Sequence, residues 1–136
     1  NAEKVVNFLK KHKEVTKVIY STEHEKKISD RAKQYLKGGN GPMVGIELKG
    51  GIEAGKKFIE SLKMFYHVAN IGDARSLAIH PASTTHSQLN EKELAASGVT
   101  QSYVRLCIGI EHIDDIIDDL GQALNKSSKG NLKAVS

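Results

Sequence analysis

The residue of this sequence that most clearly offers chemistry is an arginine inside an apolar strand pattern. Arg105 lies in the run VRLCIGI, residues 104–110, where apolar residues alternate with others. Successive side chains of a strand point to opposite faces of the sheet. The apolar residues are therefore assigned to the core face, namely Val104, Leu106, Ile108 and Ile110. The other face carries Arg105, Cys107 and Gly109. The small neighbours leave room above the sheet, where a guanidinium can bind a carboxylate or phosphate through two parallel hydrogen bonds. The pattern alone leaves open a surface ion pair instead.

A second candidate is the polar segment NIGDARSLAIHPASTTHSQ, residues 70–88, which has little helical pattern. Segments of this kind either carry function or connect elements at the surface. Several of its side chains can donate hydrogen bonds to an anionic ligand: Asn70, Arg75, Ser76, Thr85 and His86. Each of them, taken alone, also fits a turn or capping role.

The histidines and glycines predict no metal or phosphate site. We expect no metal ligands among four histidines, namely His67, His80, His86 and His112. No two of them are four residues apart, as on one face of a helix, and no cysteines at metal-binding spacing accompany them. The glycine-rich run at residues 38–41 lacks the Lys-Ser or Lys-Thr of a phosphate-binding loop and predicts a turn.

Length and composition indicate one domain. A chain of 136 residues, 39% of them hydrophobic, suits a single core.

The net charge of +4 permits contact with polyanions, but the lysines are spread out and aromatic residues are few, so we expect no nucleic-acid partner. The apolar runs are too short to cross a membrane. Cys107 is the one cysteine, and we expect it to be an inert packing residue. A lone thiol suits a reducing compartment, so we expect the protein in the cytoplasm.

Periodicity predicts the elements that must position Arg105. Helical spacing marks residues 1–12, 24–36, 52–62 and 113–124, and strand patterns mark residues 15–20, 43–48, 67–72, 76–80 and 104–110. The second helix places on one side Ile28, Ala32, Tyr35 and Leu36.

The order of these elements is not strictly βαβ, which bears on the fold class. It favours a two-layer α/β (α+β) domain with a small mixed or antiparallel sheet, helices on one face and the second face partly open. We expect this domain over residues 1–125 and a polar, frayed tail over residues 126–136. The sequence starts at Asn1, inside a helical pattern, and we therefore interpret it as an excised fragment.

A resemblance to a known family rests on the run VANIGDARSLAIHPASTTHSQLNEKELAASGVTQSYVRLCIGIEHIDDIIDDL, residues 68–120. This run resembles the C-terminal signature of the Cys/Met-metabolism family of pyridoxal-phosphate enzymes. The N-terminal part agrees too, because the segments HEKKISDRAKQYL and GIEAGKKFIESL precede this run in the order that the family shows. Within the family, NIGDARSL and HPASTTHSQL are most similar to the branch that acts on O-acetylhomoserine. The resemblance covers essentially the whole chain.

The resemblance implies the C-terminal small domain of a fold-type-I enzyme, with the large cofactor domain missing. The lysine that binds pyridoxal phosphate belongs to that missing domain, so we expect no catalytic residue here, no covalently bound cofactor and no activity of the fragment alone. The family reaction converts O-acetylhomoserine and sulfide, or a thiol, to homocysteine, or methionine, and acetate. The family also implies a homotetramer for the full-length enzyme.

The resemblance also implies roles for four substrate-binding residues. Arg105, in RLCIGIE, matches the arginine that binds the substrate α-carboxylate, and Asn70 matches a second contact to the same group. Arg75 stands where lyases of the family tend to carry an acid, and is expected to help select the acyl-homoserine side. Thr85 is expected near the same pocket.

Two other classes of function remain open at this point. One is a stand-alone α/β small-ligand-binding or regulatory domain without catalytic activity. The other is a basic nucleic-acid-binding domain, suggested only by a pI of about 9.1.

Overall fold

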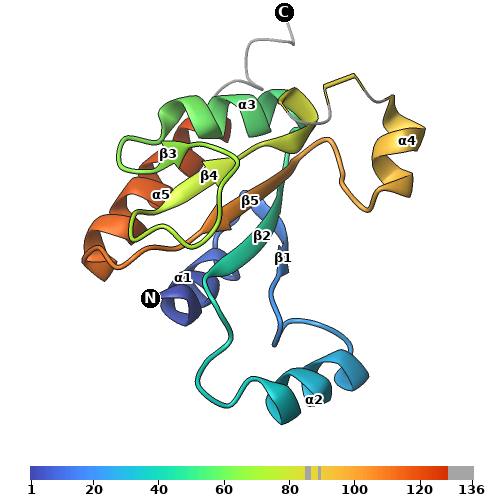
Figure 1. The fold of residues 1–136 in the computed structure, drawn as a ribbon. Coiled ribbons are helices and arrows are strands. Elements are labelled where there is room, and N and C mark those ends of the chain that lie inside the picture. The colour runs from blue at the N-terminus through green and yellow to red at the C-terminus, as the bar shows by residue number, and fades with distance from the viewer. Residues whose placement is uncertain (85–86, 89, 129–136) are drawn as a thin grey trace, which may run out of the picture.

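A helical layer packs on one side of a five-stranded sheet in the computed structural model, which describes residues 1–84, 87–88 and 90–128 (Figure 1). In chain order the elements are α1 (Ala2–Leu9), β1 (Val15–Ile19), α2 (Lys26–Tyr35), β2 (Met43–Leu48), α3 (Gly51–Ser61), β3 (Tyr66–His67), β4 (Leu77–Ile79), the 3-10 helix η1 (Pro81–Ser83), α4 (Glu91–Ala96), β5 (Tyr103–Cys107) and α5 (Ile113–Ser128). The predicted elements are present in the predicted order, except that the strand expected at residues 67–72 overlaps β3 only at His67.

The sheet has the strand order β1-β2-β5-β4-β3. β3 and β4 pair in parallel, and the other neighbouring strands pair antiparallel. This confirms the predicted mixed sheet. β5 is the central strand, with β2 on one side and β4 on the other, so its backbone is hydrogen-bonded along both edges.

The register of β5 divides its side chains between two faces as the alternation predicts. Leu106 lies opposite Val44 and Ala78, and Val104 lies opposite Ile46. All five side chains are buried in the main core. The face of Leu106 is therefore the core face.

Helices α1, α3 and α5 cover this core face (Figure 1). Each contributes side chains that solvent does not reach, among them Leu9, Phe58 and Leu120. Burying a side chain of this size contributes roughly 1.5–3 kcal/mol to folding. The expectation of helices on one face is confirmed. Helix α5 ends at Ser128, so it includes residues 126–128 of the segment expected as a tail.

The prediction that Ile110 lies on the core face is wrong. β5 ends at Cys107, and Ile110 is 83% exposed. The chain bends at Ile110, whose amide donates to the carbonyl oxygen of Ala74 at 2.9 Å. A Cβ added to Gly109 would clash with that same oxygen. Period two applies only while the chain remains a strand.

The second face of the sheet is partly covered by the chain itself. Leu77, Ile79 and Cys107 are buried on it, while Tyr103 and Arg105 are half-buried. The burial of Cys107 confirms its predicted packing role. None of the described helices is long and apolar enough to cross a membrane.

Candidate functional site

Arg105 is half-buried on the face of the sheet that the helices do not cover. Its neighbours across the sheet are Gly45 on β2 and Ile79 on β4. Its Nη2 donates a hydrogen bond to the carbonyl oxygen of Asn70 at 3.3 Å. None of the carboxylates that the structure describes forms an ion pair with it. The positive charge is therefore held in place without a neutralising partner, which suits the binding of an anion.

A cavity of about 200 Å³ opens beside this guanidinium. Its lining includes Tyr20, Ser21, His24, Gly45, Tyr103 and Arg105. The end of β1 and the segment after it form one wall, and β2 with β5 forms the other. The cavity thus combines one cation with hydroxyl, imidazole and aromatic groups.

Tyr103 is a site residue that the sequence reasoning missed. Its ring covers Gly45 so closely that a Cβ added to this glycine would lie 2.7 Å from the ring atom Cε2. Burial is the main cause that raises the pKa of the Tyr103 phenol, so the hydroxyl stays protonated near neutral pH. Two signals pointed here, namely the two-residue spacing from Arg105 and a glycine inside an apolar strand.

The structure brings Asn70 and Arg105 together through the backbone. The main-chain carbonyl of Asn70 accepts from Arg105, whereas its side-chain Oδ1 accepts from the amide of Ile71 at 2.9 Å. Asn70 is exposed to solvent. The loop around Asn70 therefore orients Arg105 as well as bordering it.

Arg75 has different surroundings from Arg105. Its guanidinium pairs with Asp73 at 3.2 Å and lies over the ring of Tyr66, 4.2 Å from the centroid. Hydrogen bonds from Arg75 hold the pKa of the Asp73 carboxyl below its ordinary value. Arg75 faces a second cavity, of about 600 Å³, together with Lys63 and Glu111. The predicted pair of arginines therefore does not share one cavity.

Two further candidates of the polar segment are accounted for differently. Ser76 is fully buried, where its hydroxyl donates to Glu111 at 2.9 Å and accepts from the amide of Gly109 at 2.9 Å. These bonds tie the segment before β4 to the turn after β5. Thr85 and His86 lie outside the described residues.

His80 is a structural residue. The ring is fully buried, with Nε2 2.7 Å from the carbonyl oxygen of Gln101 and Nδ1 2.8 Å from the hydroxyl of Ser83. Because a carbonyl only accepts, Nε2 carries the proton. Burial is the main cause that lowers the pKa of His80, so the ring is neutral near neutral pH. In residues 1–84, 87–88 and 90–128, no group of three or more potential metal ligands is found.

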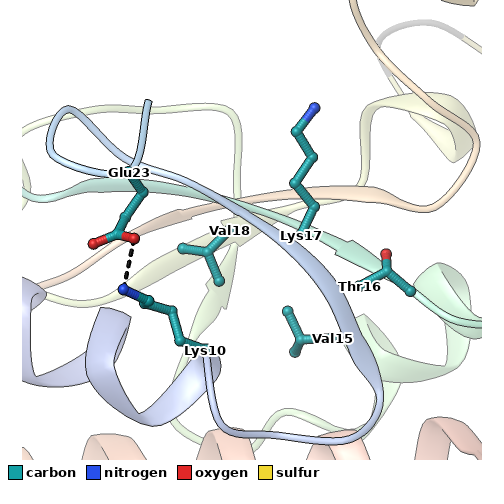
Figure 2. Close-up of a pocket in the computed structure, with 6 residues that line it drawn as sticks. All are labelled: Lys10, Val15, Thr16, Lys17, Val18 and Glu23. Atoms are coloured by element: carbon teal, nitrogen blue, oxygen red, sulfur yellow. Dashed lines mark ion pairs between the residues drawn. The ribbon is translucent and has the colours of Figure 1, made fainter. Parts of the chain in front are cut away.

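A cavity at the edge strand β1 offers a comparison with the Arg105 site (Figure 2). It has a volume of about 220 Å³, and its cations already have acidic partners. Lys10 pairs with Glu23 at 2.7 Å, and Lys17 with Glu47 at 3.7 Å. An anion would have to displace a carboxylate here, so the Arg105 cavity is the better anion site.

Comparison with known proteins gives a consistent match. The profile of the family described as Cys/Met metabolism PLP-dependent enzyme matches residues 1–125. An O-acetyl-L-homoserine sulfhydrylase of Leptospira meyeri is 50% identical over 125 residues, which are 91% of this chain and 28% of that protein. An L-methionine gamma-lyase of Fusobacterium nucleatum subsp. polymorphum is 43% identical over 126 residues, 93% of this chain and 32% of that protein.

A solved structure agrees with these matches. It is described as an O-acetylhomoserine (thiol)-lyase of Campylobacter jejuni with N'-pyridoxyl-lysine-5'-monophosphate. It superimposes with a TM-score of 0.81 at 42% identity, and the match covers 91% of this chain and 30% of that chain. The chain thus spans less than a third of the length of the relatives it matches.

Proposed function

Because the chain belongs to the Cys/Met metabolism PLP-dependent enzyme family, we propose that residues 1–125 form the substrate-binding C-terminal domain of a sulfhydrylase. The reaction would convert O-acetylhomoserine and sulfide, or a thiol, to homocysteine, or methionine, and acetate. The sulfhydrylase relative, at 50% identity, supports this choice of substrate. Below, "the longer polypeptide" means a chain of the relatives' length that includes residues 1–136.

The observation that carries the proposal is Arg105, which lines its cavity and forms no ion pair with any carboxylate of the described residues. O-acetylhomoserine is an amino acid and presents an α-carboxylate. The Asn70 carbonyl engages Nη2 of the guanidinium at 3.3 Å and restrains its rotation. The remaining N–H donors have no hydrogen bond to the described residues, so they can bind both carboxylate oxygens. A preorientated fork of this kind loses little entropy on binding.

The rest of the site acts around this clamp. The exposed amide of Asn70 is the proposed second donor to the carboxylate. The protonated Tyr103 closes one wall of the cavity over Gly45 and limits the water beside the guanidinium. Arg75 is already engaged by Asp73, and Thr85 is outside the described residues, so their proposed roles rest on the family resemblance alone.

The Arg105 cavity does not itself fit the role of holding pyridoxal phosphate. That cofactor needs a lysine for its aldehyde and a partner for its ring nitrogen. Among the described residues that line the Arg105 cavity there is neither a lysine nor a carboxylate. The cofactor, which stabilises carbanions when bound, would be held by the rest of the longer polypeptide. This chain would bind the carboxylate and thereby orient the substrate toward it.

In the reaction, the bond between the γ-carbon and the acetyl ester oxygen breaks, and acetate leaves with the electron pair. A bond from the sulfur of sulfide to the γ-carbon forms. Arg105 fixes the amino-acid end of the substrate, which leaves the acyl end free to exchange.

The test is the substitution Arg105→Ala in the longer polypeptide, with steady-state kinetics on O-acetylhomoserine. Removing a hydrogen bond between charged groups costs about 1.5–3 kcal/mol, which predicts a rise in KM of roughly 10- to 150-fold. Lys4→Ala removes an exposed cation of α1, on the helical side of the sheet, and should leave KM unchanged. Equal kinetics of Arg105→Ala and wild type would refute the clamp.

The same assay separates the two kinds of relative. Rapid turnover of L-methionine without added thiol, and none of O-acetylhomoserine, would show the lyase activity named for the second relative and contradict the proposed substrate. We also propose a cytoplasmic location, because the lone thiol suits a reducing compartment, and a homotetrameric full-length enzyme, as the family resemblance implies.

A further inference from the structure

Helix α2 is the element of this structure that its own fold leaves uncovered. It has no buried residue, and Figure 1 shows it projecting away from the sheet and the helical layer. One side of it carries Ile28, Ala32, Tyr35 and, at the C-cap, Leu36, here called the α2 stripe. Ile28 is 46% exposed, Tyr35 71% and Leu36 43%. Three large apolar side chains thus face solvent together on one helix.

Such a helix has little to stabilise it by itself. It is 10 residues long, and its N-cap, Glu25, makes no side-chain capping hydrogen bond. Helices of this length are marginal in water, and most helical stability in proteins comes from packing an amphipathic face. One surface ion pair, between Lys26 and Asp30 at 2.6 Å, adds only a few tenths of a kcal/mol. The apolar pattern of the sequence and the exposure of these side chains therefore both indicate that another surface covers the α2 stripe.

The attachment of α2 indicates where that surface must lie. Its two connections are fastened at their base, where the Tyr20 hydroxyl donates to the carbonyl oxygen of Gly41 at 2.9 Å. Ser21 and His24, which precede the helix, line the cavity of Arg105, as does Met43, which follows it. Both connections of α2 therefore border this cavity.

We propose that the α2 stripe docks on the cofactor-bearing remainder of the longer polypeptide. This inference rests on the proposed function. The length of chain outside the structure supports it, since the matched domain makes up 28% of the sulfhydrylase relative and 30% of the superimposed chain. Most of such a polypeptide is therefore available as a partner.

The charge on α2 specifies the chemistry of the receiving surface. The helix and its immediate flanks carry Lys26, Lys27, Arg31, Lys33 and Lys37 against Glu25 and Asp30. The stripe thus has a basic border. The complementary surface has an apolar centre for Tyr35 and Ile28, with carboxylates at its rim.

Docking at this place has a consequence for the substrate site. Ser21 and His24 belong to the segment that leads into α2, so fixing the helix also fixes one wall of the Arg105 cavity. The α2 stripe is therefore a positioning element, because it acts on the substrate only through that wall.

The test measures hydrogen exchange of the α2 amides in the longer polypeptide and in residues 1–136 alone. We expect the amides of residues 29–36 to exchange slower in the longer polypeptide, by on the order of tenfold or more. Tyr35→Asp should abolish this difference because it puts a charge into the docked face. Gln34→Asp puts the same group on the exposed neighbouring side and should preserve it.

Each other outcome overturns the docking. Equal exchange in the two chains would mean that nothing covers α2, and equal effects of the two substitutions would mean that the stripe is not the docked face. If the α2 amides of residues 1–136 alone exchanged slowly, and more slowly still at higher protein concentration, the partner would be a second copy of this chain.

The outcomes for docking and for the proposed function are separable. A longer polypeptide that protects α2 but lacks activity on O-acetylhomoserine contradicts the proposed function only. One that has this activity while α2 exchanges freely contradicts the docking only.

Discussion

Two arginines of this chain, Arg75 and Arg105, differ in how readily they can bind an anion. The difference comes from the one neighbouring group that each guanidinium contacts most closely. Arg75 is paired with Asp73 at 3.2 Å, whereas Arg105 donates to the neutral carbonyl of Asn70 at 3.3 Å. A carboxylate ligand would compete with Asp73 at the first site and meet no acidic competitor among the described residues at the second. The partner, more than the residue type, thus decides which arginine is available to an anion.

His80 gives a prediction for the dependence of stability on pH. Burial lowers its pKa below the usual 6.5, so the unfolded chain binds a proton more readily than the native one. The free energy of unfolding should therefore be unaffected above that value and fall as pH decreases below about 6.5. Urea unfolding at about pH 7.5 and about pH 5.5 measures this, and an NMR titration of the His80 ring reports its pKa directly.

Two observations check the assignment to His80. His80→Asn should reduce the loss of stability on acidification, with a remainder from His12, whose pKa burial also lowers. His112→Asn, at an exposed position, should keep the wild-type dependence. An NMR pKa of His80 at or above 6.5 would contradict the prediction, even if the variant did not fold.

At the scale of elements, two helical glycines predict opposite effects of the same substitution. A Cβ on Gly55 of α3 would clash with the ring of His80, which has no room to move because it is buried. Gly55→Ala should therefore destabilise the domain by about 1–3 kcal/mol. A Cβ on Gly121 of α5 would lie 3.5 Å from Cζ of Phe8, an ordinary contact, so Gly121→Ala should stabilise by about 0.5–1 kcal/mol.

Thermal or chemical denaturation of the two variants, each against wild type, checks this pair. The matched design removes the general benefit of alanine in a helix from the comparison. If both variants were stabilised, the packing of His80 against α3 would be wrong.

The alternation of side chains allowed the strands to be predicted from sequence. Val104 and Leu106 are buried and Arg105 faces the other side, as period two requires. The same pattern failed at Ile110, because no local signal showed that pairing stops at Cys107. The short helix α4 was not predicted at all. Six residues give too little periodicity to distinguish a helix from a turn.

The surroundings of Arg105 were less predictable than its face. The Asn70 carbonyl reaches it across a sequence separation of 35 residues, and this contact depends on the path of the loop before β4. That path is held by Glu111, whose carboxylate accepts from the Ser76 amide at 2.6 Å. Neither bond follows from local propensity, since each needs the tertiary fold first. The family resemblance implied a role for Arg105 but not this support.

At the scale of the whole molecule, the proposed function assigns the cofactor to residues outside this chain. We therefore expect residues 1–136, mixed with pyridoxal phosphate and reduced with borohydride, to show no stoichiometric modification of a single lysine. A specific adduct needs a pocket that fixes both the aldehyde and the ring. Mass spectrometry of the digested protein measures the distribution. Full modification of one lysine would place a cofactor site within this chain.

The central position of β5 bears on which changes in chain length this protein can tolerate. Leu106 is locked between Val44 and Ala78, with Arg105 beside it facing the other way. An insertion or deletion of one residue within the strand would turn the guanidinium into the apolar interior and expose the leucine. Lineages that carry this domain should therefore vary in length in the connection before Tyr103, and keep the strand itself free of gaps.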